Sequence, residues 1–250
     1  MADGGRNTII VNLYAGPGAG KTTCAWIIAG ELKKLGLPTE YVPEYAKELV
    51  WDGKVDLLDG SFANQSALLH EQDRRIRRLV GKVDVVVTDS PILLSCIYAR
   101  ERSAYFAAVA RELYNGYQNF DLFVVRGVAY EMEGRIHTWE QSLAIDGRVE
   151  SLLRENGISY GICGHDTLGL VVNNILAALG KPTEGDTHYG RGGGRGVYSP
   201  AKKTIGDYMT LIAAERRASG NTSQSYGGEA DDHNFGIGTP TAAFCGGKGV

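Results

Sequence analysis

The chain has little of what marks secreted, membrane or metal-binding proteins. Its 250 residues include four cysteines, with no CxxC pair and no metal-ligand spacing. The opening residues Met-Ala-Asp-Gly-Gly-Arg lack the apolar core of a signal peptide. No run approaches the ~18 apolar residues of a membrane helix, because Asn173 and Asn174 interrupt the best candidate. We therefore expect a cytoplasmic location and no membrane partner.

An excess of basic charge is also missing. The formal net charge is −3, with 22% charged and 43% hydrophobic residues, which is typical of a globular protein. A role in nucleic-acid binding would therefore have to rest on a local patch rather than on the overall charge. The length allows one medium domain, or one domain followed by a tail.

Strand-like and helix-like segments alternate through residues 8–180. Buried strands are expected at 8–14, 39–42, 83–88, 120–125 and 158–163, and helices at 21–35, 62–80, 93–114, 140–155 and 167–179. The alternation predicts an α/β fold with a parallel sheet of about five strands, flanked by helices on both faces. Ligands of such folds bind at the carboxyl ends of the strands.

Residues 181–250 have a different composition. They hold 15 of the 34 glycines and few apolar runs, so we expect a flexible, largely disordered tail after a domain at 1–180, with one helix near 201–218. Within the tail, 187–206 contain no acidic residue, and "YGRGGGRGVY" mixes arginine, glycine and tyrosine. This pattern fits either a nucleic-acid-binding tail or a solvated linker.

The stretch "YAGPGAGKTT" joins the first strand to the first helix and predicts a phosphate-binding loop. Its glycines let consecutive backbone N–H groups point at phosphate oxygens, while Lys21 reaches the β- and γ-phosphates of ATP. The usual pattern begins with glycine, and Ala15 departs from it, which is tolerated if its φ is negative. The residues expected to bind the nucleotide are Gly16, Pro17, Gly18, Ala19, Gly20, Lys21, Thr22 and Thr23.

An aspartate follows the third strand in "VVVTDSP". Asp89 there, with the Thr22 hydroxyl, is expected to hold Mg²⁺, although an aspartate before Pro91 also suits a helix cap. The residue after Asp89 is Ser90, whereas ATP-driven machines usually place a glutamate there to activate water. The chain also lacks an Asn-Lys-x-Asp guanine-reading motif. Both absences favour phosphoryl transfer to a bound acceptor over a motor or a GTPase switch.

Such a transfer needs a group that orients or deprotonates the acceptor hydroxyl. Glu44 follows the second strand, at the same edge of the sheet as the phosphate loop, and can accept that proton. It fits equally well as an acid in the first turn of a helix. Asp89 is a second candidate for this task.

Transfer also needs positive charge over the triphosphate. Arg126 ends the fourth strand, and Arg135 lies in an irregular segment, so residues 127–142 are expected to form a lid that closes arginines over the phosphates. Surface arginines in a loop are the alternative. Asp146 and Glu140 would tether this lid or solvate the following helix.

The polar helix expected at 62–80 precedes the third strand, where it could wall the acceptor pocket. Gln72 and Arg75 are the predicted acceptor-binding residues, because a paired amide can hold a base edge. A solvated helix face is the alternative for both, and for Gln65 and Arg74. His165 and Asp166 are interpreted as a loop pair, since nothing places a nucleophile beside them.

The stretches "AGPGAGKTT", "VPEYAKEL", "VVVTDSP" and "VRGVAYEMEGR" resemble the P-loop nucleoside and nucleotide kinases of the thymidylate-kinase-like group. The chain is more similar still to phage-encoded members related to nicotinamide-riboside kinase domains. The resemblance covers roughly residues 8–163 and implies a P-loop fold, kinase chemistry with ATP and Mg²⁺, and a host-cell cytoplasm.

The resemblance identifies the acceptor poorly. Some phage relatives are similar to kinases of 5-hydroxymethyluracil in DNA, a step toward hypermodified thymidines, and others to kinases of free deoxynucleotides. A base within DNA would have to leave the stack to reach a pocket. The tail and the arginines of the helix at 62–80 are compatible with binding a DNA strand, whereas the net charge gives no support for DNA binding. The resemblance narrowly favours the DNA base.

Overall fold

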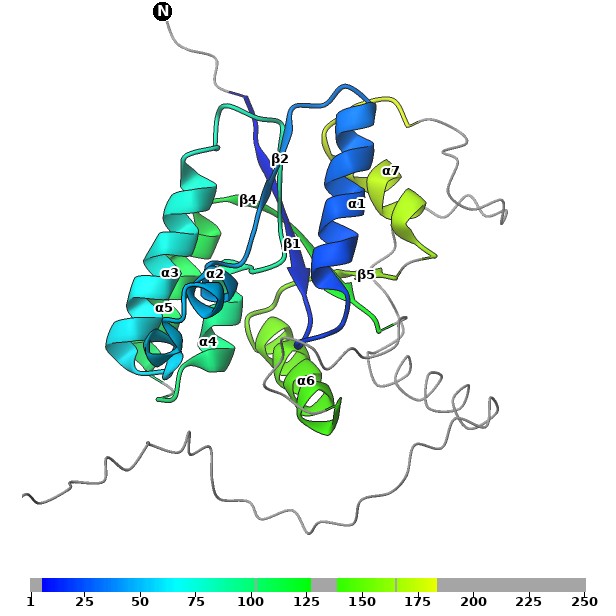
Figure 1. Ribbon diagram of the computed structural model, residues 1–250. Helices are drawn as coiled ribbons and strands as arrows, with labels where there is room; N and C mark the ends of the chain where they lie inside the picture. The colour runs from blue at the N-terminus through cyan, green and yellow to red at the C-terminus, as the bar shows by residue number, and fades with distance from the viewer. Residues whose placement is uncertain (1–5, 102, 127–138, 165, 184–250) are drawn as a thin grey trace, which may run out of the picture.

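One parallel sheet organises the chain. The computed structural model describes residues 6–101, 103–126, 139–164 and 166–183. Within them, five parallel strands run in the order β2-β3-β1-β4-β5 (Figure 1). The strands are β1 (Ile9–Tyr14), β2 (Thr39–Val42), β3 (Val85–Thr88), β4 (Gln118–Val124) and β5 (Gly161–Cys163). The predicted α/β fold with about five parallel strands is confirmed.

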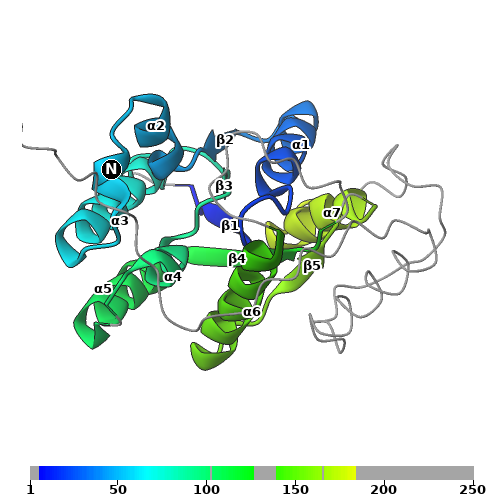
Figure 2. The same cartoon turned by 60° about the horizontal axis from the view of Figure 1, so that its bottom comes forward.

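Helices cover both faces of this sheet. They are α1 (Lys21–Lys34), α2 (Tyr45–Trp51), α3 (Phe62–Arg77), α4 (Ser95–Tyr98), α5 (Ala104–Asn115), α6 (Trp139–Glu155) and α7 (Leu168–Ala178), with short 3-10 turns η1 (Val55–Leu58) and η2 (Ile92–Leu94). Helices α1 and α7 lie side by side on one face, and α3 and α5 on the other (Figures 1 and 2). Every residue of β1 and β3 is buried as a result. Burial on both faces explains why these strands read as continuous apolar runs.

The single helix predicted over 93–114 is wrong. The chain instead forms η2, α4 and α5, with a break between Tyr98 and Ala104. The Ser103 hydroxyl accepts a hydrogen bond from Phe106 N at 3.2 Å and so caps α5, while Arg100 N donates to Gly60 O at 2.8 Å. These bonds satisfy backbone groups that a continuous helix would have used, and Ala99 between the two helices has an extended backbone.

Two predicted regions fall outside the described residues. They are most of the lid expected at 127–142, including Arg135, and the tail from residue 184 onward. Of the segment predicted as a lid, the structure describes only residues 139–142, which form the start of α6.

Candidate active site

The phosphate loop leaves β1 and enters α1 through two left-handed glycines. Gly18 has φ 73° and Gly20 has φ 93°, a region that residues with a side chain rarely adopt. No residue other than glycine has a positive φ in the described part of the chain, and Ala15 is fully buried. Ala15 therefore has a negative φ, which is the condition under which alanine was expected to be tolerated at this position.

Gly16 is the position where a side chain has no room. A Cβ built there would lie 2.7 Å from Ser142 O and 2.9 Å from Asp146 Oδ1, both on α6. The Gly16 N–H donates to Asp146 Oδ1 at 2.5 Å. The loop therefore begins in direct backbone contact with a helix that follows it by more than 120 residues in the sequence.

Lys21 lies within the loop. Its ammonium donates to Ala15 O at 2.9 Å and to Gly16 O at 3.0 Å. Burial lowers the pKa of Lys21, while the carboxylates of Glu44, Asp89 and Asp146 oppose that shift. A cation that is bound to two carbonyls and lies in the field of three carboxylates is placed where a polyphosphate would supply further negative charge.

Thr22 and Asp89 meet at the carboxyl end of β3. The Thr22 hydroxyl donates to Asp89 Oδ2 at 2.5 Å, and Asp89 is 3% exposed. Its other oxygen, Oδ1, accepts no hydrogen bond from the described residues although it is buried. A buried carboxylate oxygen without a donor, beside a hydroxyl, is a donor set that suits Mg²⁺. The residues present therefore fit the metal predicted from the sequence.

Tyr41 on β2 belongs to the same site and was missed by sequence reasoning. Its hydroxyl lies close to Asp89 and Thr22, and burial together with the Asp89 carboxylate raises its pKa. Its ring meets Trp26 edge-on, with centroids 6.3 Å apart. The available signal was positional, since Tyr41 stands near the carboxyl end of the strand that pairs with β3.

Glu44 lies where the sequence placed it. It precedes α2 at the N-cap position, but its side chain makes no capping hydrogen bond there. Burial raises the pKa of its carboxyl group, Lys21 lowers it, and Asp89 raises it further. The same carboxylate raises the pKa of Tyr98, after burial itself, so Tyr98 of α4 also faces this group. A partly exposed acid held among these residues can exchange a proton with a ligand.

Arg126 lies beside the phosphate loop, but its guanidinium is paired with a carboxylate. Its Nε donates to Asp146 Oδ2 at 2.6 Å and its Nη2 to Ser142 O at 3.2 Å. Asp146 thus neither solvates α6 nor contacts bulk water, whereas Glu140 is exposed. The structure gives Arg126 a buried carboxylate as its partner.

The predicted acceptor residues on α3 make protein contacts instead. Gln72 is 4% exposed; its amide donates to Pro43 O at 3.3 Å and to Thr88 Oγ1 at 3.4 Å, and its oxygen accepts from Tyr45 N at 3.2 Å. Both its donors and its acceptor therefore fix the start of α2 against β3. Its NH2 donors are used within the protein, so the donor–acceptor pair that a base edge requires is not available.

Arg75 also links α3 to α2. Its guanidinium forms two 2.6 Å bonds to the Glu48 carboxylate and one of 2.9 Å to Glu71, and it lies 4.5 Å from the centre of the Tyr45 ring. Arg74 and Arg77 pair with Glu71 and Asp73 in the same way. Three of the arginines proposed to contact a DNA strand, Arg74, Arg75 and Arg77, are thus paired with carboxylates, mostly from their own helix.

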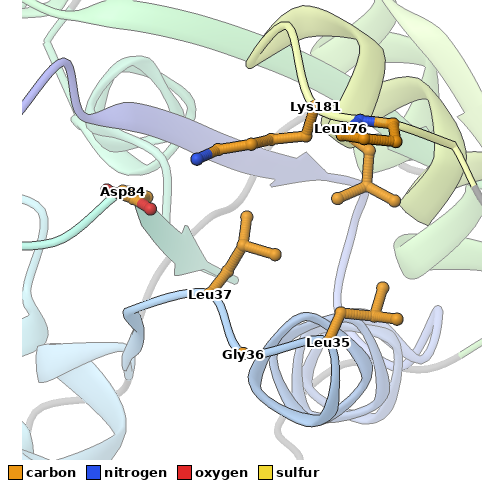
Figure 3. A pocket seen from close by; sticks show the side chains of 7 residues that line it. Leu35, Gly36, Leu37, Asp84, Leu176 and Lys181 are labelled. Carbon is orange, nitrogen blue, oxygen red and sulfur yellow. The ribbon is translucent and has the colours of Figure 1, made fainter.

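A cavity of about 310 Å³ lies elsewhere, at the amino ends of the strands (Figure 3). It is lined by Leu35, Gly36, Leu37, Asp84, Leu176, Lys181 and Pro182. None of these belongs to the phosphate loop or its neighbours.

The described helices include none that is long and apolar enough to cross a membrane.

Five parallel strands with a glycine-rich loop after β1 and an aspartate after β3 define a P-loop nucleotide-binding protein. The chain belongs to the family described as AAA domain, whose profile matches residues 10–167. No curated protein sequence matches the chain.

Solved structures resemble the chain at low identity. Thymidylate kinase from Ehrlichia chaffeensis shares 13% identity at a TM-score of 0.47, over 69% of this chain and 99% of that one. The Mycobacterium tuberculosis APS kinase CysC, in complex with AMPPNP and APS, shares 15% identity at a TM-score of 0.36, over 85% and 99%. At these values the activity has to be argued from the site itself.

Proposed function

We propose that the protein is an ATP-dependent kinase that transfers the γ-phosphoryl group to a hydroxyl of a pyrimidine-type acceptor. The observation that carries this proposal is the position of Glu44: an acid of raised pKa, beside Lys21 and Asp89, that caps no helix N–H. Ser90, in place of a glutamate, follows Asp89. The candidate proton acceptor is thus carried by the segment after β2, and not by the residue that follows Asp89 in the sequence, where ATP-driven machines carry it.

In the proposed reaction the loop amides and Lys21 bind the β- and γ-phosphates of ATP. Thr22 and Asp89 would hold Mg²⁺, which supplies neutralisation of phosphate charge when bound. The acceptor oxygen forms a bond to the γ-phosphorus while the bond to the β–γ bridging oxygen breaks and ADP leaves. The hydroxyl proton passes to Glu44, whose raised pKa makes it a better base than an exposed glutamate.

We propose that Arg135 supplies the positive charge over the γ-phosphate. Arg126 is bound to Asp146 in the described structure, which favours Arg135 for this role within the proposed lid at 127–142. Arg135→Ala should then lower kcat by on the order of 10³-fold while changing the Kd for ATP little. Equal losses in turnover and affinity would contradict the lid.

The favoured acceptor is 5-hydroxymethyluracil in phage DNA, within a thymidine hypermodification pathway. This choice is supported by the resemblance of the sequence motifs alone, because the α3 arginines are paired with carboxylates. A free deoxynucleoside monophosphate or a nucleoside, including nicotinamide riboside, is the alternative acceptor. Such an acceptor would need no strand-binding surface.

A regulatory ATPase is the alternative from a different class. It predicts ADP release without an acceptor, increased by a partner protein. The kinase proposal predicts that hydrolysis is slow and that an acceptor speeds ADP formation.

The experiment is phosphate transfer from γ-labelled ATP with Mg²⁺ to a panel of acceptors. Label in hydroxymethyluracil-containing DNA, but not in the same duplex with thymine, would support the favoured acceptor. Label in a free nucleotide or nucleoside would support the alternative. ADP without any labelled acceptor, at a rate that Glu44→Gln leaves unchanged, would contradict the kinase.

A further inference from the structure

The ion pair between Arg126 and Asp146 differs from the other ion pairs of the described residues. Both of its side chains are 3% exposed, whereas every other pair has at least one side chain that is 24% exposed or more. Burying two charges costs desolvation free energy, and an apolar pair of the same shape is often equally stabilising or more so. A reason other than stability is therefore needed for its presence beside the phosphate loop.

Such a reason is offered by a third partner of the pair, the backbone amide of Gly16. One carboxylate oxygen of Asp146 receives Arg126 Nε at 2.6 Å, and the other receives the Gly16 amide at 2.5 Å. The guanidinium in turn reaches Ser142 O, one turn before Asp146 on α6. The end of β4, the first glycine of the loop and α6 are thus joined by three bonds in one buried cluster.

The space between Gly16 and α6 is too small for a side chain. A methyl group at Gly16 would meet Ser142 O at 2.7 Å, Asp146 Oδ1 at 2.9 Å and Arg126 Nη2 at 3.1 Å. A displacement of α6 towards the loop would press Ser142 O and Asp146 against the Gly16 backbone, and a displacement away would break the Gly16 N–H bond to Asp146. The charges also reach the nucleotide site, because both Asp146 and Arg126 act on the pKa of Lys21.

We propose that Arg126 and Asp146 are positioning residues: their ion pair fixes the Gly16 amide and couples the conformation of the phosphate loop to the position of α6. Neither side chain contacts the phosphates in this role. Arg126 orients the Asp146 carboxylate, which in turn holds Gly16 N–H. The proposal rests on the nucleotide binding that the proposed function requires, but not on the acceptor or on phosphoryl transfer.

A positioning role and a purely electrostatic role predict changes of opposite sign in ATP affinity for Asp146→Asn. Asp146→Asn leaves a guanidinium near the triphosphate, so an electrostatic role would tighten ATP binding. A positioning role predicts weaker binding both for Asp146→Asn and for Arg126→Met, because each loosens Gly16. The double variant R126M/D146L removes both charges, so it avoids the unpaired buried charge that threatens the folding of the single variants.

The test uses the full chain, calorimetry with ATP and Mg²⁺, and amide NMR. We expect the double variant to bind ATP at least about fivefold more weakly and to shift the Gly16 amide proton upfield, with smaller losses for Asp146→Asn. Asp73→Asn is the matched control: it removes a buried carboxylate paired with Arg77 on α3 and should leave both readouts unchanged.

Tighter ATP binding by Asp146→Asn, or wild-type affinity in the double variant with an unshifted Gly16 amide, would overturn the proposal. If the double variant does not fold, Asp146→Asn and Arg126→Lys decide the question by the same two readouts. The NMR readout needs neither ATP nor an acceptor. A chain that binds ATP, and binds it more weakly in these variants, yet phosphorylates no acceptor would refute the kinase and leave the coupling standing.

Discussion

Charged residues gather in two regions of the protein, and they are arranged differently. On α3, the arginines at 74, 75 and 77 lie near the surface and pair with carboxylates, most of them three or four positions away on the same helix. Around the phosphate loop, charges from α1, α6 and the segments that follow β2, β3 and β4 converge below the surface. The first arrangement follows from local sequence spacing and stabilises helices modestly. The second depends on the whole fold and leaves groups that can act on a ligand.

The largest effect should come from the loop itself. Lys21→Ala removes the cation that the cluster of carboxylates surrounds, so we expect ATP-dependent activity to fall by on the order of 10²–10³-fold or more. Calorimetry with ATP and Mg²⁺, alongside the transfer assay, measures the loss. Activity close to that of the unaltered chain would mean that the buried charges are structural, like those of α3.

Glu44→Gln should affect activity and stability in opposite directions. Turnover should fall by about 10²-fold or more, because the proton acceptor is lost. Burial raises the pKa of Glu44 in the folded chain, so the folded state binds that proton more tightly than the unfolded state. The free energy of unfolding therefore declines as pH rises from the unfolded pKa of about 4.3 through the folded pKa.

The variant should lack this decline and melt at a higher temperature at neutral pH. Thermal unfolding followed at several pH values, for the unaltered chain and for Glu44→Gln, provides the check. A lower melting temperature for the variant at pH 7, or kcat unchanged by it, would argue that Glu44 is a structural acid.

Arg75→Met on α3 should have the smallest effect. The bonds to Glu48 and Glu71 and the contact with the Tyr45 ring are near the surface, so the loss of stability should be about 1 kcal/mol. Denaturant unfolding measures this loss, and the Kd for ATP should not change. A tenfold rise in the KM for the acceptor would instead place Arg75 at the acceptor, as the sequence predicted.

The sequence predicted the parts of this site that depend on neighbouring residues. The apolar strands, the glycine-rich turn and the aspartate after β3 are local patterns, and parallel pairing then brings their ends together: Val42, Thr88 and Asn12 are in register. Thr22 and Asp89 could be paired for this reason.

The contacts that sequence reasoning missed depend on how helices dock. Gln72 carries the polar groups of a base-binding amide, but the packing of α3 against the start of α2 and the end of β3 uses its donors. The bond between Gly16 and Asp146 spans 130 residues and requires the position of α6, which no periodicity encodes. The break between α4 and α5 depends on Gly60, which lies about 40 residues upstream of the segment that it contacts.

The lack of space at Gly16 has a consequence for how this loop is recognised in other chains. In this protein a methyl group is accommodated at the first position of the motif, whereas at the second it would collide with a carbonyl oxygen. A search template that insists on glycine first would pass over such a chain. One that asks for glycine second, together with an acid on the helix after the fourth strand, would retrieve relatives built in the same way.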